Sequence, residues 1–212
     1  MKRRGSGHPN RRVNTAGDRR PNLLIFSEGE VTEVQYINDW YKRHRDLVTV
    51  EFDPYHGTPF ELVKQAVEAK KREAREEKRG RGRAHSHYWC IFDRDEHPYI
   101  RETFSLAEAH GIHTAYTNPC IELWFLLHFQ EQTASLHRHV AQHIAKGYLK
   151  CDKSLTPRAL SFLAEEERFN IAKERALKLD IKHDGDGSPA ASNPSSGVWK
   201  LVEMIKGSKA SD

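Results

Sequence analysis

The sequence contains little sulfur and little apolar surface. Its 212 residues include only three cysteines, Cys90, Cys120 and Cys151, and none belongs to a C-x-x-C pair. Cysteines so far apart argue against a disulfide framework and against a zinc site built from thiolates. Only 37% of the residues are hydrophobic, and the mean hydropathy is −0.78. The core is therefore expected to come from a few segments surrounded by polar surface.

Long apolar runs are also missing. No stretch approaches the roughly 18 residues that a membrane-spanning helix requires. The basic start, Met1 to Arg4, is not followed by the apolar segment of a signal peptide. We therefore expect a soluble, cytoplasmic protein that has no membrane partner.

Positive charge is in modest excess but is unevenly distributed. The net charge is +4, and residues 1–21 contain seven Lys and Arg residues against the single acid Asp18. This segment has no hydrophobic period, so we expect a disordered basic arm. Clustered cations bind phosphate backbones regardless of base sequence. The nucleic-acid contacts predicted for the arm come from Arg11, Arg12, Arg19 and Arg20.

Strands and helices are predicted to alternate over residues 22–130. Apolar runs predict strands over 23–27, 48–52, 87–92 and 113–116. Helical spacing and start signals predict helices after Thr32, over 59–79, from Pro98 and over 121–129. The alternation predicts an α/β fold with a mostly parallel sheet flanked by helices.

Two helix starts carry capping signals. Thr32 and Gln35 have the spacing of a capping box. Thr58 precedes Pro59, which is the usual order of an N-cap and a proline in the first helical position. We expect each threonine to accept a hydrogen bond from the first turn of its helix.

The remainder, residues 131–212, is predicted to be a helical extension. Within it, 183–197 is a flexible Gly/Ser/Pro/Asp loop that returns to the core, and 198–205 is a last short helix. Asn193 and Ser195 in this loop either cap that helix or offer donors to a phosphate at the functional site. Lys200 follows one turn later and is a further candidate for nucleic-acid binding.

Two acidic segments about sixty residues apart follow two of the predicted strands. Glu28 follows the first strand, and Asp93 and Asp95 follow the third. Mg²⁺ prefers oxygen ligands, usually one or two carboxylates together with water and substrate phosphates. If the two strands are neighbours, all three carboxylates meet at one edge of the sheet. The alternative is that these acids only cap helices and form turns, and spacing alone leaves both interpretations open.

Further ionisable residues also have two interpretations each. Glu33 is either a first-turn acid that suits the helix dipole or part of the acidic site. Glu122 lies in the most apolar segment, where a charge needs a partner, so it joins the acidic cluster or forms a salt bridge or cap. His128 in the same segment is more often a core histidine than a proton shuttle. His139 and His143 have the spacing of a zinc-binding helix but lack the H-E-x-x-H form.

Four motifs resemble those of the RloB-like family of bacterial proteins. They are Glu28-Gly29-Glu30-Val31-Thr32-Glu33, Phe92-Asp93-Arg94-Asp95, the segment 118–129 that begins Asn118-Pro119, and Asn193-Pro194-Ser195-Ser196. The resemblance covers roughly residues 22–203. That family is associated with restriction-modification loci and abortive phage resistance, and its core is similar to the Toprim fold. In that fold a Glu follows the first strand and a D-x-D a later one, which implies Glu28, Asp93 and Asp95 as a Mg²⁺ or Mn²⁺ site.

The residues and the resemblance together predict a Mg²⁺-dependent, Toprim-like nuclease of anti-phage defence. Asp93 and Asp95 hold the metal, and Glu28 is an acid/base group or a ligand of a second metal. Glu33 and Glu122 orient or complete the site. The alternative is a module that binds nucleic acid or nucleotide without cutting it, beside a partner protein from a defence operon that carries the activity. The sequence leaves DNA, RNA and nucleotide open as the substrate.

Overall fold

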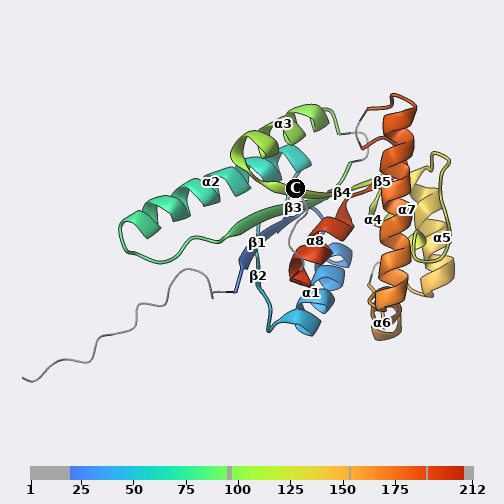
Figure 1. Cartoon of the computed structure of the whole chain (residues 1–212), viewed down its shortest axis with the longest axis horizontal. Helices are drawn as coiled ribbons and strands as arrows, with labels where there is room; N and C mark the ends of the chain where they lie inside the picture. The colour runs from blue at the N-terminus through green and yellow to red at the C-terminus, as the bar shows by residue number, and fades with distance from the viewer. Residues whose placement is uncertain (1–19, 95–96, 153, 190, 208–212) are drawn as a thin grey trace, which may run out of the picture.

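A computed structural model of the chain describes residues 20–94, 97–152, 154–189 and 191–207 (Figure 1). The strands are β1 (Asn22–Ser27), β2 (Thr49–Phe52), β3 (His87–Asp93), β4 (His113–Asn118) and β5 (Ser195–Ser196). They form one sheet in the order β2-β1-β3-β4-β5. All neighbours are parallel except β4 and β5, which are antiparallel. The predicted α/β fold with a mostly parallel sheet is therefore confirmed.

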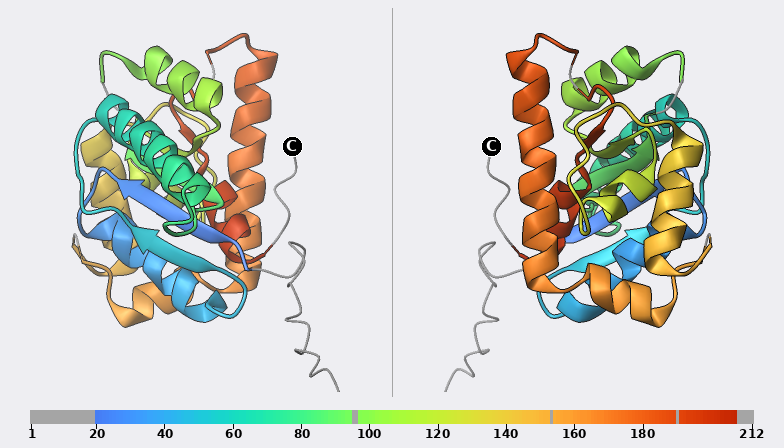
Figure 2. Two further views of the ribbon diagram at one scale, coloured as in Figure 1. Left: turned by 90° about the vertical axis from the view of Figure 1, so that its left-hand side faces the viewer. Right: turned by 90° about the vertical axis from the view of Figure 1, so that its right-hand side faces the viewer.

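Helices cover both faces of this sheet. They are α1 (Thr32–His44), α2 (Pro59–Lys78), α3 (Ile100–His110), α4 (Ile121–Leu126), α5 (Arg138–Leu149), α6 (Pro157–Leu163), α7 (Glu166–Gly185) and α8 (Val198–Ile205). Helices α2 and α3 lie on one face, and α1 and α8 lie on the other (Figure 1). The remaining helices, α4 to α7, lie on the side of the sheet where β4 and β5 are found (Figure 1), and Figure 2 shows the same fold from two sides. Among the described residues, no helix combines the length and the apolar character that crossing a bilayer requires.

The central strands are apolar on both faces because both faces are covered. Leu23 and Ile25 of β1 point into the core shared with α1, α7 and α8. Leu24 and Phe26 of the same strand point into the core under α2 and α3. All four side chains are at most 3% exposed. Strands β1 and β3 are therefore fixed in place from two sides.

Local sequence signals behave as predicted at the start of α2. Thr58 accepts a hydrogen bond from the backbone N–H of Glu61, whose carboxylate accepts one from the Thr58 backbone, so the capping box is complete. Pro59 follows in the first helical position. Gly111 ends α3 at φ 60°, the left-handed conformation that glycine adopts without strain.

The capping box predicted for Thr32 and Gln35 is wrong. The N-cap of α1 is Val31, and no side-chain bond caps the helix there. The Gln35 amide instead donates to Ser154 Oγ at 3.1 Å and accepts from the Leu155 N–H at 2.8 Å. Gln35 therefore ties the first helix to the segment between α5 and α6, a long-range contact that a local pattern does not reveal.

The segment predicted as a loop over 183–197 contains parts of two elements. Helix α7 continues to Gly185, and Ser195 and Ser196 form β5. Ser195 pairs with Asn118, and Ser196 pairs with Thr117. The chain thus returns to the sheet as a short edge strand beside β4, just before α8 begins.

The buried His128 gives a stability prediction. Burial lowers the pKa of His128 to about 4, and its Nδ1 lies 3.0 Å from the Trp124 carbonyl oxygen. Below its ordinary pKa of 6.5 the unfolded state takes up a proton that the folded state refuses, so stability falls as pH falls. At pH 5 this linkage costs roughly 2 kcal/mol. Denaturant unfolding of His128→Met should lose correspondingly less stability than the wild type between pH 7 and pH 5.

The matched control is His110→Gln, at the exposed end of α3. It should follow the wild-type pH profile. A His128→Met profile parallel to the wild type would show that burial of His128 does not govern acid stability.

Candidate functional site

Two carboxylates meet at the carboxyl ends of β1 and β3. The strands pair in parallel with Ser27 opposite Ile91, so the residues that follow both strands leave the sheet at the same edge. Glu28 Oε2 accepts a hydrogen bond of 3.1 Å from the backbone N–H of Asp93. The Glu28 N–H in turn donates to the Ile91 carbonyl at 3.0 Å. The acids predicted from the two motifs, Glu28 and Asp93, are therefore neighbours.

Glu33 joins them because Gly29 leaves room for it. A Cβ atom on Gly29 would lie 2.0 Å from Glu33 Oε2, closer than atoms can approach. The carboxylate of Glu33 thus occupies the space that any side chain at position 29 would fill. Glu33 comes from the first turn of α1 and is only 8% exposed. Glu33 is therefore a first-turn acid of α1 whose carboxylate is also buried beside the other two acids.

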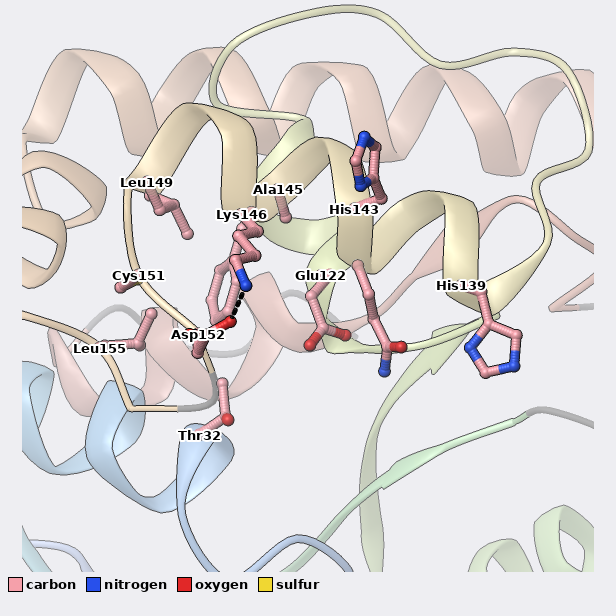
Figure 3. Close-up of a pocket in the computed structure, with 12 residues that line it drawn as sticks. Thr32, Glu122, His139, His143, Ala145, Lys146, Leu149, Cys151, Asp152 and Leu155 are labelled. Carbon is pink, nitrogen blue, oxygen red and sulfur yellow. Dashed lines mark ion pairs between the residues drawn. The ribbon is translucent and has the colours of Figure 1, made fainter.

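Glu122 enters from the first turn of α4. It lies close enough to Glu33 and Asp93 for its charge to raise the pKa of both. It also lines a cavity of about 340 Å³ beside α5, together with Thr32, Gln142 and Lys146 (Figure 3). Three strand ends thus supply the acidic cluster, which consists of Glu28, Glu33, Asp93 and Glu122.

Two partners of the cluster, an arginine and a histidine, were not found from the sequence. Arg138, the first residue of α5, donates from Nη2 to Asp93 Oδ2 at 2.7 Å. His97 Nε2 lies 3.1 Å from Glu28 Oε1. Neither residue stands in a recognisable motif. Only the fold, which brings α5 against the end of β3, places Arg138 at the site.

The cluster holds more negative charge than its partners balance. Burial raises the pKa of Asp93 well above its ordinary value, Glu33 and Glu28 add to the rise, and Arg138 opposes it. Burial also raises the pKa of Glu33, with Glu122 and Glu28 contributing. The pKa of Glu28 is raised by burial against the opposing effect of His97. A cation that entered the cluster would relieve this repulsion.

The donor atoms of the cluster suit a hard divalent ion, which binds carboxylate oxygens. In the part of the chain that the structure describes, no three His, Cys, Asp or Glu side chains are grouped as ligands of one ion. Asp95, the second acid of the predicted D-x-D pair, lies outside the described residues. Asp93 and Glu28 are the described members of the predicted metal set, with Glu33 and Glu122 beside them.

A family model for the RloB-like protein matches residues 23–205. The chain belongs to the RloB-like family. The match spans both acidic segments, the Asn118-Pro119 segment and the Asn193-Pro194 segment, from which the resemblance was drawn. Comparisons with curated proteins and with solved structures found no match.

In this RloB-like protein, Asn193 supports the site from a distance. Its side-chain amide accepts from the Leu136 N–H at 2.9 Å and donates to the Leu136 carbonyl at 2.8 Å. Leu136 lies two residues before Arg138, so Asn193 fixes the segment that leads into α5. Asn193 therefore positions the segment that carries Arg138.

The hydroxyl of Ser195 is buried in β5 and has no hydrogen-bond partner among the described residues.

Other predicted residues lie elsewhere in the RloB-like fold. His128 is 3% exposed and packs against Trp124 within the core. Lys200 is exposed on α8, with its Nζ 5.5 Å from the Trp199 ring centre. Arg20 precedes β1 and Glu28 follows it, so the two residues lie at opposite ends of this strand. The Arg20 Nη1 lies 3.5 Å from the Arg45 carbonyl oxygen. Arg11, Arg12 and Arg19 lie outside the described residues.

The two histidines with zinc-like spacing do not converge. His139 and His143 are both exposed on α5, and their rings point in different directions beside the cavity (Figure 3). A solvated helix face accounts for them, as the absence of the H-E-x-x-H form indicates.

The raised pKa of Glu33 predicts a stabilising substitution. Below its ordinary pKa of 4.5 the side chain is protonated in both the folded and the unfolded state. As pH rises through the raised pKa, folding must bury a charge that the unfolded chain carries freely. Glu33→Gln in metal-free buffer at pH 7.5 should therefore raise Tm by about 2–4 °C, the shift that 1 kcal/mol produces in a domain of this size.

The control for this substitution is Glu30→Gln in the loop just before α1, because Glu30 is exposed. It should leave Tm unchanged. The difference between Glu33→Gln and the wild type should also vanish near pH 4. A lower Tm for Glu33→Gln at pH 7.5 would contradict the electrostatic description of the cluster.

Proposed function

We propose that this RloB-like protein is a Mg²⁺-dependent, Toprim-like nuclease that acts in anti-phage defence. The observation that carries the proposal is the convergence of Glu28, Glu33, Asp93 and Glu122 at the carboxyl edge of a parallel sheet. Ligands of open α/β sheets bind at that edge. Buried carboxylates that repel one another destabilise a fold, and such groups are characteristic of functional sites. The motifs on which the family resemblance rests contain the same four residues in the same order along the chain.

Asp93 and Asp95 are the residues proposed to hold the metal, and Glu28 is either a ligand of a second metal or an acid/base group. The ion would supply a Lewis acid for a phosphate oxygen and lower the pKa of a bound water. Mn²⁺ would serve as well, since it also accepts carboxylate oxygens. Glu33 and Glu122 would keep the cluster acidic enough to recruit a divalent cation.

Glu28 and His97 form the proposed proton-transfer pair. Glu28 is 27% exposed at its side chain and His97 is 26% exposed, so both are within reach of solvent and substrate. A carboxyl whose pKa is raised by burial takes up and releases protons closer to neutral pH than an ordinary glutamate. The contact of 3.1 Å to His97 lets the proton pass to the imidazole.

Arg138 is the proposed phosphate ligand. Its side chain is 36% exposed, and its guanidinium presents several donors in a planar fork that suits phosphate oxygens. It now bonds to Asp93. We propose that a bound phosphate shares Arg138 with that carboxylate.

One observation favours the alternative, a binding module without nuclease activity. Glu28 and Asp93 already have protein partners in His97 and Arg138, and the described residues hold no ready-made set of three metal ligands. In that case the cluster would bind nucleic acid or nucleotide, and a partner protein from the same defence system would act on it.

The test is a panel of single- and double-stranded DNA and RNA incubated with purified protein and Mn²⁺ or Mg²⁺. Wild type should cleave at least one member, and EDTA should stop cleavage. Asp93→Asn and Glu28→Gln keep the shape of each side chain but remove its charge. Each should reduce the cleavage rate by about 10²-fold or more, the usual contribution of an acid/base or metal-binding group.

Glu30→Gln is the matched control and should cleave at the wild-type rate. Undiminished cleavage by Asp93→Asn would refute the proposed site. If the wild type cuts nothing but binds a member of the panel in an Asp93-dependent manner, the binding module is the better description. Calorimetric titration of Mn²⁺ into wild type and Asp93→Asn separates the two cases further, since the nuclease requires an ion that only the wild type retains.

A further inference from the structure

Three aromatic rings from separate segments stack face to face near the carboxyl end of α5. The Phe129 ring lies between Tyr148 and Phe162, with 4.5 Å between ring centres on each side. The interplanar angles are 14° and 12°. The guanidinium of Arg168 closes the far end of the stack, with its Cζ 3.9 Å from the centre of Phe162. The other end is Tyr148, which is 44% exposed.

Tyr148 is held in this position from its hydroxyl end. The hydroxyl donates to Gln130 Oε1 at 2.9 Å. The ring is thus fixed at one edge by a hydrogen bond and on one face by Phe129. An exposed aromatic ring that is already immobilised loses little conformational freedom when a planar ligand stacks on it.

Phe129, Tyr148 and Phe162 all line a pocket of about 650 Å³. Lys150 and Arg158 stand at its rim, and both are exposed. None of the described residues that line the pocket is acidic. Aromatic faces combined with cations and without acids are the chemistry that binds the bases and phosphates of nucleic acid.

Helix α5 connects this aromatic pocket with the acidic cluster. Arg138 begins α5 and contacts Asp93, and Tyr148 follows ten residues later, about 15 Å along the helix axis. The cavity that Glu122 lines occupies the interval, and Leu149 lines both spaces. A strand lying along α5 would therefore pass from the aromatic pocket to the carboxylates.

We propose that Tyr148, Lys150 and Arg158 bind single-stranded nucleic acid and deliver it to the acidic cluster. This inference rests on the proposed function and names its substrate class. A base of the strand stacks on Tyr148, and Lys150 and Arg158 contact the adjacent phosphates. Duplex is a poor ligand for the same pocket, because its bases are already stacked on both faces and cannot reach the ring.

The test measures binding rather than cleavage. Fluorescein-labelled dT20, U20 and a duplex of equal length are titrated by anisotropy against full-length protein in EDTA. Wild type should bind one or both single strands more tightly than the duplex. Tyr148→Ala and Tyr148→Leu should weaken single-strand binding by about tenfold, the effect of losing one stacked base. Tyr148→Phe keeps the ring but loses the hydrogen bond to Gln130, so it should weaken binding much less than Tyr148→Ala does.

The cations have their own measurement. Arg158→Ala and Lys150→Ala should each lower the slope of log affinity against log salt by about 0.7, the value for one lost phosphate contact on a single strand. Tyr99→Ala and Arg72→Ala are the matched controls, because both residues are exposed near α3 and on α2, away from α5. Both should bind as the wild type does.

Failure of this proposal and failure of the nuclease are distinguishable. Single-strand binding that depends on Tyr148, without any cleavage in Mn²⁺, supports the pocket and refutes the nuclease. Cleavage with unchanged binding by Tyr148→Ala and Tyr148→Leu overturns the pocket and leaves the nuclease standing. Tighter binding of duplex than of either single strand also overturns the proposal.

Discussion

The parallel pairing of β1 with β3 is the constraint on which the rest of the site depends. Once Ser27 lies opposite Ile91, Glu28 and Asp93 must leave the sheet side by side. Everything else is added around that pair. Helix α1 brings Glu33 over Gly29, α4 brings Glu122, and α5 brings Arg138 to Asp93. The two apolar cores hold β1 and β3 from opposite faces, so the pair of acids follows two strands that are packed on both sides.

That arrangement sets stability against chemistry. Gathering four carboxylates in one cluster, with Glu33 and Asp93 buried, costs free energy, and only part of it is offset by Arg138 and His97. The cores under α2 and around α1 supply the surplus that lets the fold carry such a cluster. The cost of burial is largest at Asp93. This carboxylate is more deeply buried than Glu28, and its pKa is raised further.

Sequence patterns were sufficient for the features that depend on neighbouring residues. Apolar runs located β1 to β4, and the Thr58 signal located the start of α2, because each depends on a few consecutive side chains. Patterns were insufficient where distant segments meet. Gln35 has the spacing of a cap but bonds to Ser154, and Arg138 looks like an ordinary surface arginine until α5 is seen against β3. The two-residue strand β5 is too short to have an apolar period at all.

The amide of Asn193 on the Leu136 backbone has a consequence for the timing of assembly. Glu28 is translated 165 residues before Asn193. Until Asn193 has been translated, the segment before α5 lacks the two hydrogen bonds that help to align Arg138 with Asp93. A nascent chain therefore contains the acidic residues long before it contains the residue that helps to position Arg138 beside them. For a protein whose site is proposed to attack nucleic acid, this order means that a nascent chain shorter than 193 residues lacks one contact that positions Arg138 at the site.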